Sequence, residues 1–101
     1  MQTQSEKLRV GVVGLGWAGE THLKSYLNIP NVEVVALAEP QEVRLTNVGT
    51  TYGIEALYTD YRALLERSDL DIVSVATPNH LHMPVTVAAL QAGKHVLCEK
   101  P

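Results

Sequence analysis

The most regular feature of the sequence is an alternation between short apolar runs and segments in which apolar residues recur every three or four positions. Short apolar runs rich in Val, Leu, Ile and Ala are typical of strands covered on both faces of a sheet. They predict strands over residues 8–13, 32–38, 55–58, 71–76 and 95–98. The helical spacing between these runs predicts helices over residues 17–28, 41–51, 60–67 and 81–92. The pattern therefore predicts an α/β protein.

Residues that start or stop elements agree with these boundaries. Pro30 cannot continue a helix and predicts a turn, while Gly53 and Gly93 are expected to end the second and fourth helices. Thr59 is expected to cap the third helix. Alternating strands and helices with right-handed crossovers predict a doubly wound, Rossmann-type parallel sheet in the order 3-2-1-4-5 with four helices. A ligand is expected at the carboxyl ends of strands one and four, where this order reverses.

The first strand runs into the glycine pattern G-x-G-x-x-G, at Gly14, Gly16 and Gly19. In a pyrophosphate-binding turn, the first glycine permits the sharp bend, the second allows close backbone approach to the phosphates, and the third packs the helix against the strand. A strand before the triplet, a helix after it and an acidic residue 20 positions later strengthen this interpretation over a purely structural glycine turn. We predict that a dinucleotide binds along this loop, at Gly14, Leu15, Gly16, Trp17, Ala18 and Gly19.

The acidic residue is Glu39, which ends the second strand. A carboxylate at this place can accept hydrogen bonds from the adenosine ribose hydroxyls. The same charge would repel the 2′-phosphate of NADP, so NAD is predicted over NADP. Arg44 weakens that preference, because a long cation nearby could accept a phosphate, although a solvated helix residue is the simpler interpretation.

Length and composition exclude several classes of protein. A chain of 101 residues, 46% hydrophobic and 19% charged, is expected to form one globular domain over residues 8–101 after a flexible leader, residues 1–7. The net charge of −3 offers no basic patch for nucleic acid, and no apolar run approaches the length of a membrane span. Cys98 is the lone cysteine, which fits a reducing, cytoplasmic setting, and we expect it to pack within the fifth strand.

Metal binding is not predicted, although the chain has four histidines. His80 and His82 stand two positions apart and do not share a helix face, and the chain has no cysteine pair with zinc-ligand spacing. His22 is expected to be a solvated helix residue.

Two longer segments make the sequence recognisable. The runs Ala76–His82 (ATPNHLH) and Ala92–Pro101 (AGKHVLCEKP), together with the glycine loop and the Ala38-Glu39-Pro40 strand end, resemble the Gfo/Idh/MocA family of NAD(P)-dependent oxidoreductases. The resemblance covers nearly the whole chain. It departs at Glu39, where many members of that family have Asp, and the longer Glu side chain keeps a carboxylate for the ribose.

The resemblance implies roles for residues that the glycine pattern does not reach. It implies that cofactor contacts come from Thr77, Pro78, Asn79, His82, Glu99 and Lys100. Lys100 of the Glu-Lys-Pro motif would reach the nicotinamide ribose and the substrate hydroxyl, and so is the candidate catalytic residue. The motif also implies a cis bond before Pro101.

The family's activity is hydride transfer between the nicotinamide and a carbinol carbon of a sugar, polyol or related ring. Its substrate domain, with the catalytic His, would lie beyond residue 101, so we expect the chain to be a truncated cofactor domain that binds NAD without turnover. The alternative is a minimal or engineered Rossmann folding module without activity. Another nucleotide user, a flavoprotein or methyltransferase, is disfavoured by the segments around Pro78 and Lys100. An exposed edge of the fifth strand predicts a homodimer.

Overall fold

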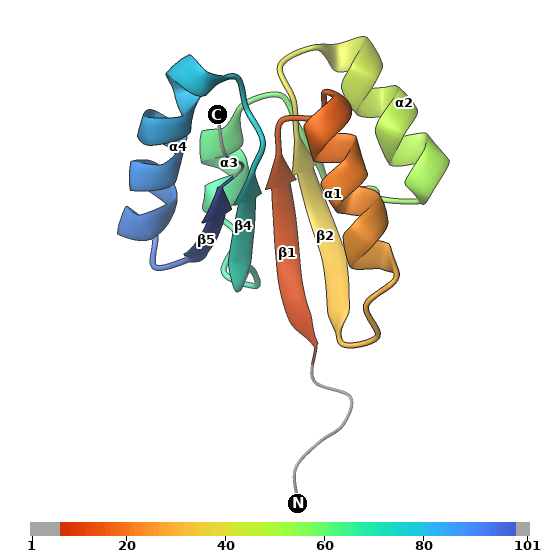
Figure 1. Cartoon of the computed structure of the whole chain (residues 1–101), viewed down its shortest axis with the longest axis horizontal. Helices are drawn as coiled ribbons and strands as arrows, with labels where there is room; N and C mark the ends of the chain where they lie inside the picture. Colours follow the sequence, from red (N-terminus) through yellow and green to blue (C-terminus); the bar gives the residue numbers. More distant parts are fainter. Residues whose placement is uncertain (1–6, 99–101) are drawn as a thin grey trace, which may run out of the picture.

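The computed structural model describes residues 7–98, and their centre is a five-stranded parallel sheet (Figure 1). The strand order is β3-β2-β1-β4-β5, as the sequence predicts. The strands are β1 (Leu8–Val13), β2 (Val32–Ala38), β3 (Leu57–Tyr58), β4 (Ile72–Val75) and β5 (His95–Cys98). Every strand pair is parallel, so all the carboxyl ends meet at one edge of the sheet.

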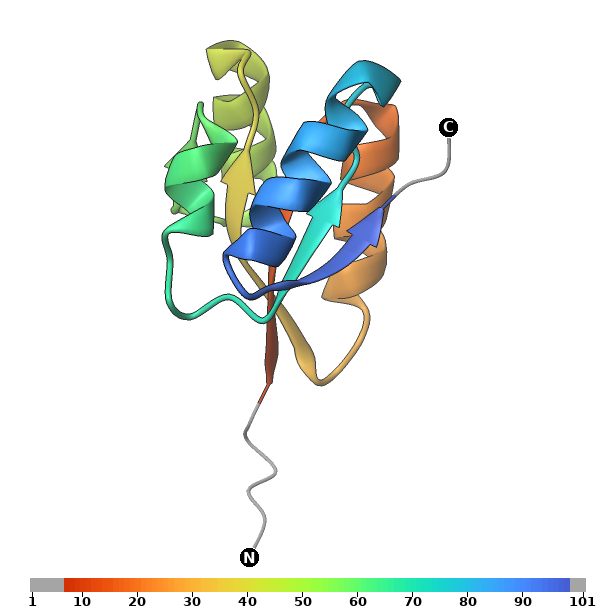
Figure 2. The same ribbon diagram turned by 90° about the vertical axis from the view of Figure 1, so that its left-hand side faces the viewer.

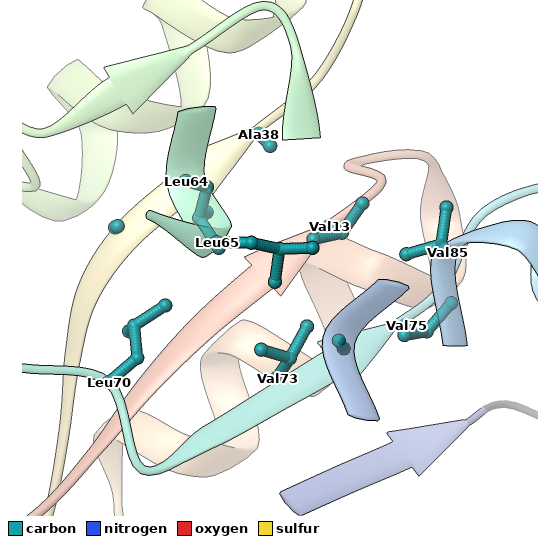
Figure 3. Packing of buried hydrophobic residues seen from close by; sticks show 10 residues of the cluster. Val13, Ala38, Leu64, Leu65, Leu70, Val73, Val75 and Val85 are labelled. Atoms are coloured by element: carbon teal, nitrogen blue, oxygen red, sulfur yellow. The ribbon is translucent and has the colours of Figure 1, made fainter. Parts of the chain in front are cut away.

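The helices cover both faces of the sheet, as Figure 2 shows for α1 and α4 on opposite sides of β4 and β5. They are α1 (Trp17–Leu27), α2 (Glu42–Tyr52), α3 (Tyr61–Leu65) and α4 (Asn79–Gln91). Leu23 of α1 and Leu45 of α2 pack with Val12 on one face. Leu64 of α3 and Val85 of α4 pack on the other face, where Figure 3 shows the second core cluster. Two separate apolar layers therefore hold the sheet from both sides.

Local backbone geometry and hydrogen bonds set the ends of the helices. Gly53 and Gly93 have φ of 71° and 81° and lie where α2 and α4 end, which confirms both predicted stops. The prediction that Thr59 caps the third helix is wrong. Asp60 is the N-cap, because its carboxylate Oδ1 accepts a hydrogen bond from the backbone N–H of Arg62 at 2.9 Å.

The fourth helix begins earlier than predicted, at Asn79, with Pro78 as its N-cap residue. The fixed φ of Pro78, −55°, leads directly into the first turn, and its carbonyl accepts the N–H of Leu81 at 2.8 Å. Asn79 therefore belongs to the helix and not to the loop. Strand β3 is also shorter than predicted, since only Leu57 and Tyr58 pair with β2.

Two side chains differ from expectation on the α1 side of the sheet. Cys98 was expected to pack within β5 but is exposed, because β5 is an edge strand. His22 was expected in solvent, yet it is half-buried with its Nδ1 3.4 Å from the Oγ of Ser74. The hydroxyl of Tyr26 donates to the same oxygen at 2.9 Å. Ser74, fully buried in β4 beside the central strand β1, thus has polar partners from α1.

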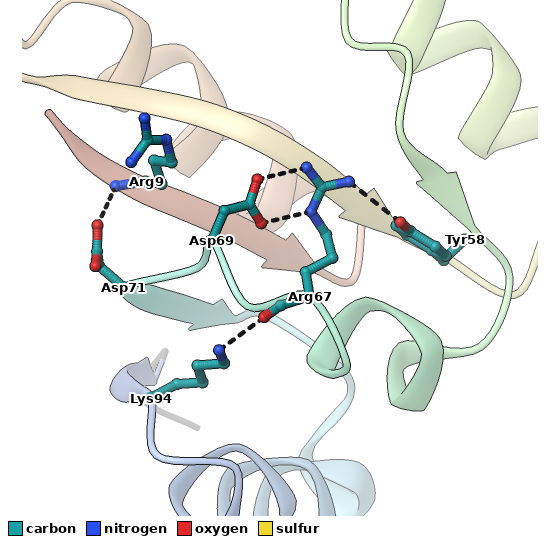
Figure 4. A network of polar contacts seen from close by, with 6 residues as sticks. All are labelled: Arg9, Tyr58, Arg67, Asp69, Asp71 and Lys94. Carbon is teal, nitrogen blue, oxygen red and sulfur yellow. Dashed lines mark hydrogen bonds and ion pairs between the residues drawn. The ribbon is translucent and has the colours of Figure 1, made fainter.

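Polar contacts gather around the turn after α3 and the amino ends of β1, β4 and β5 (Figure 4). Arg67 donates through Nη2 and Nε to the two carboxylate oxygens of Asp69 at 2.7 and 2.9 Å. These hydrogen bonds lower the pKa of Asp69 and raise the pKa of Arg67. Nζ of Lys94 donates to the carbonyl of Arg67 at 2.8 Å, and the backbone N–H of Arg9 donates to Asp71 at 2.9 Å. Nη1 of Arg67 also donates to the hydroxyl of Tyr58, the last residue of β3, at 3.2 Å.

Within residues 7–98, no helix combines the length and the apolar character that crossing a membrane requires.

Candidate functional site

A cavity of about 760 Å³ opens at the carboxyl edge of the sheet. It lies where β1 stands between β2 and β4, so the chain leaves the sheet to opposite sides at this point. The lining residues beyond Val13 and Ala38 are 14–18 after β1, 39–41 and 44 after β2, 59–62 after β3, and 76–78, 81 and 85 after β4. This is the place that the strand order predicts for a ligand.

A side chain would meet different surroundings at each of the three glycines of the loop. Gly14 has φ of +94°, and a Cβ there would stand 2.7 Å from the carbonyl oxygen of Ala76. A Cβ on Gly19 would overlap the carbonyl oxygen of Gly14, so α1 can rest on β1 only if this residue has no side chain. A Cβ on Gly16 would meet nothing within 4 Å. Gly14 and Gly19 are thus required by the fold, whereas the space beside Gly16 is available to a ligand.

Helix α1 begins directly after this open space. Gly16 is its N-cap residue and Trp17 its first residue, and both line the cavity. The backbone N–H groups of a first helical turn have no acceptor within the helix, and they form the positive end of the helix dipole. Trp17 is 84% exposed, which places an indole ring at the cavity wall without burying it in the core. The arrangement suits an anion held by backbone N–H groups.

Glu39 contributes the charge of the second wall. It is 5% exposed, and its carboxylate is held from both sides. Oε1 accepts the backbone N–H of Leu15 at 2.8 Å, and Oε2 accepts that of Gln41 at 3.1 Å. Nη1 of Arg44 lies 3.7 Å from Oε2. The carboxylate is therefore oriented before any ligand arrives, and the cation predicted as a possible phosphate acceptor is already near a counter-charge.

The wall after β4 contains part of the segment that carries the family resemblance. Thr77 and Pro78 line the cavity, and within residues 7–98 the buried Oγ1 of Thr77 has no hydrogen-bond partner. Asn79 is exposed in the first turn of α4, and the half-buried His82 follows in the same helix. Neither residue is among those that line the cavity, which receives Leu81 from this helix instead. Glu99, Lys100 and Pro101 lie outside the described residues.

The fourth wall was not predicted from the sequence. It consists of Thr59, Asp60, Tyr61 and Arg62 at the start of α3. The guanidinium carbon of Arg62 lies 5.6 Å from the ring centroid of Tyr61, and the backbone N–H of Arg62 lowers the pKa of Asp60 by hydrogen bonding to it. The parallel sheet offers the signal that would have located this wall, because residues that follow β3 must reach the same edge as those that follow β1, β2 and β4.

The site fits a dinucleotide on three observations. The loop leaves an open approach at Gly16, and Glu39 presents an oriented carboxylate in the same cavity. Thr77 adds a buried hydroxyl that has no hydrogen-bond partner among the residues that the structure describes. A pyrophosphate needs the first feature, and a ribose needs the second. No three His, Cys, Asp or Glu side chains gather as a metal site in the part of the chain that the structure describes.

Comparison with known proteins agrees with this geometry. Residues 8–101 match the family model of the Gfo/Idh/MocA proteins, described as an oxidoreductase family with an NAD-binding Rossmann fold. The chain belongs to the Gfo/Idh/MocA family. The matched part is the NAD-binding Rossmann domain of that family, which confirms the resemblance, the fold class and the cofactor type predicted from the sequence.

Several of the relatives are dehydrogenases of sugars or polyols by name. Inositol 2-dehydrogenase of Salmonella typhimurium is 41% identical over 96 residues, which are 93% of this chain and 29% of that protein. The crystal structure of a probable dehydrogenase from Thermotoga maritima has a TM-score of 0.90 and 35% identity, covering 93% of this chain and 28% of that one. A structure of levoglucosan dehydrogenase in complex with NADH has a TM-score of 0.88 and 33% identity, covering 95% and 28%. The chain thus spans under a third of the length of these relatives.

Proposed function

We propose that the cavity at the carboxyl edge of the sheet binds NAD, with the pyrophosphate against the glycine loop and the adenosine ribose against Glu39. The single observation that carries the proposal is the open approach at Gly16 beside the oriented carboxylate of Glu39 in one cavity. The part of the cavity around the buried Thr77 hydroxyl then remains for the nicotinamide half. We further propose cofactor contacts at Leu15, Trp17, Ala18 and Pro78, which line the cavity, and at Asn79 and His82 of α4.

The reaction proposed for the longer protein is hydride transfer between NAD and a carbinol carbon of a sugar, polyol or related ring. The names of the relatives support this substrate class, since they include an inositol 2-dehydrogenase and a levoglucosan dehydrogenase. Bound NAD would supply the hydride acceptor, and the protein would supply orientation and charge. Lys100, together with Glu99, is proposed to contact the nicotinamide ribose, and Lys100 would also steady the substrate oxygen. For the 101-residue chain alone we propose cofactor binding without turnover.

The proposed preference for NAD over NADP rests on charge. A 2′-phosphate on the adenosine ribose would stand against the carboxylate of Glu39, and like-charge juxtaposition costs several kcal/mol. Arg44 offsets part of this repulsion, but its guanidinium already lies 3.7 Å from Glu39. Replacing Glu39 with Ser is expected to narrow the preference, and an unchanged ratio of NADH to NADPH affinity would contradict the role. The cytoplasmic location inferred from the lone Cys98 stays a prediction.

The test is a titration of NADH, and separately of NADPH, followed by the fluorescence of Trp17. Trp17 is the single tryptophan, it is exposed, and it lines the cavity, so a bound dinucleotide is expected to change its emission. Saturable quenching with tighter binding of NADH supports the proposal. A flat response, together with no heat of AMP binding by calorimetry, would contradict it and leave a Rossmann scaffold without cofactor affinity.

A further inference from the structure

Two consecutive amides of the glycine loop are bonded to the end of strand β2. The backbone N–H of Gly14 donates to the carbonyl of Ala38 at 2.8 Å. The next one, from Leu15, donates to the side-chain oxygen Oε1 of Glu39, also at 2.8 Å. The loop is therefore anchored first by main chain and then by a carboxylate, immediately before the open approach at Gly16.

We propose that Glu39 positions the glycine loop for pyrophosphate binding, independently of any contact that it makes with ribose. Leu15 and Glu39 are 2% and 5% exposed, so water cannot readily replace the bond between them. Hydrogen bonds from N–H groups to a carboxylate are shorter and stronger than neutral ones. The opposite oxygen of Glu39 accepts the Gln41 N–H, which prevents the carboxylate from turning away. Through Leu15, Glu39 thus controls where the N–H groups of Gly16 and Trp17 point.

This inference rests on the proposed function, but it can be separated from a ribose contact. For ligands without ribose hydroxyls, the two roles of Glu39 predict different changes in affinity when Glu39 is removed. If Glu39 acts only as a ribose acceptor, a ligand without ribose hydroxyls gains nothing from it. Removing a negative charge near the loop should then leave the affinity for such an anion unchanged or raise it. If Glu39 positions the loop, its removal weakens the binding of that anion, because the N–H groups are no longer aligned.

The experiment compares ADP with 2′,3′-dideoxyADP, which keeps the adenine and the pyrophosphate but lacks both ribose hydroxyls. Each nucleotide is titrated into the 101-residue chain and into Glu39→Ala and Glu39→Gln variants, and Trp17 fluorescence reports binding. We expect Glu39→Ala to weaken 2′,3′-dideoxyADP by about tenfold, the range for losing a charged hydrogen bond. Glu39→Gln keeps an oxygen that can accept the Leu15 N–H, so we expect it to lose less than threefold.

Glu42 supplies the matched control, because it is an exposed acid in the first turn of α2 without a bond to the loop. Glu42→Ala removes the same charge nearby and is expected to leave 2′,3′-dideoxyADP affinity unchanged. Unchanged or tighter binding of 2′,3′-dideoxyADP by Glu39→Ala, with weaker binding of ADP, would overturn the inference in favour of a ribose contact alone.

Amide hydrogen exchange provides a second measurement that needs neither a folded Glu39→Ala variant nor any bound nucleotide. The Leu15 amide of the unmodified chain is expected to exchange far more slowly than the amide of Gly16, and slow exchange is expected to persist in Glu39→Gln. Leu15 exchange as fast as that of Gly16 would overturn the inference. Failure of NADH binding would instead contradict the proposed function, so the two failures are distinguishable.

Discussion

Gly14 and Gly16 stand two positions apart in one loop, and the structure assigns them opposite sensitivities to a single methyl group. Gly14→Ala forces an L-residue to φ of +94° and places its Cβ 2.7 Å from the backbone oxygen of Ala76. A backbone atom of the β4 end cannot move aside as a flexible side chain could. Gly16→Ala adds a methyl group into space that is empty to 4 Å. The backbone there is extended, with a φ of −69° that alanine adopts readily.

The expected losses of stability follow from these contacts. The unfavourable φ at Gly14 costs about 1–2 kcal/mol, and the overlap with Ala76 raises the total to about 3 kcal/mol or more. With a urea m-value of about 1.5 kcal/mol/M, the unfolding midpoint should fall by about 2 M. At Gly16 two small effects oppose each other. Ala is a poorer N-cap residue than Gly, but it restricts the unfolded chain, so the net change should stay within about 0.5 kcal/mol.

Binding should show the reverse order. A methyl group on Gly16 occupies the approach that the pyrophosphate needs, so at least one hydrogen bond to a charged oxygen is lost. That loss is about 1.5–3 kcal/mol, or roughly tenfold to a hundredfold in the Kd for NADH. Urea unfolding followed by circular dichroism measures the first quantity, and Trp17 fluorescence measures the second. Gly16→Ala with wild-type NADH affinity, or Gly14→Ala with wild-type stability, would refute this assignment of roles.

Three further outcomes are expected. Leu64→Ala removes a fully buried side chain from the core layer beneath α3 and should lower the free energy of unfolding by about 3 kcal/mol in a urea titration, whereas a loss under 1 kcal/mol would contradict the packing. Hydrogen bonds from Arg67 lower the folded-state pKa of Asp69, so this pair stabilises the fold above the ordinary carboxyl pKa, about 4, and the contribution disappears as the pH falls through the lowered pKa. Asp69→Asn should make the unfolding midpoint fall less steeply as the pH is lowered below about 4. An unchanged dependence of the midpoint on acid pH would argue against the pair. Self-association through the edge of β5 predicts a dimer by sedimentation, and a monomer at high concentration would disprove it.

The sequence by itself determined the fold class, the strand order and the glycine loop. Alternating apolar runs and helical spacing are local patterns, and a parallel sheet with right-handed crossovers leaves few ways to arrange them. The roles of Gly14 and Gly19 could likewise be predicted from the sequence, because the backbone at these positions leaves no room for a side chain. Glu39 was placed correctly at the carboxyl end of β2 by its distance from the loop.

Only the tertiary structure decided which side chains meet. The wall at Asp60 and Arg62, the bond from Leu15 to Glu39, and the partners of Ser74 join residues far apart in the chain, across strands whose neighbours are not their neighbours in sequence. Helix caps depend on a single hydrogen bond, which is why Asp60 and not Thr59 begins α3. Periodicity records which face of an element is apolar. Contacts between side chains depend on strand register and on packing between elements, and both are set only when the strands assemble on either side of β1.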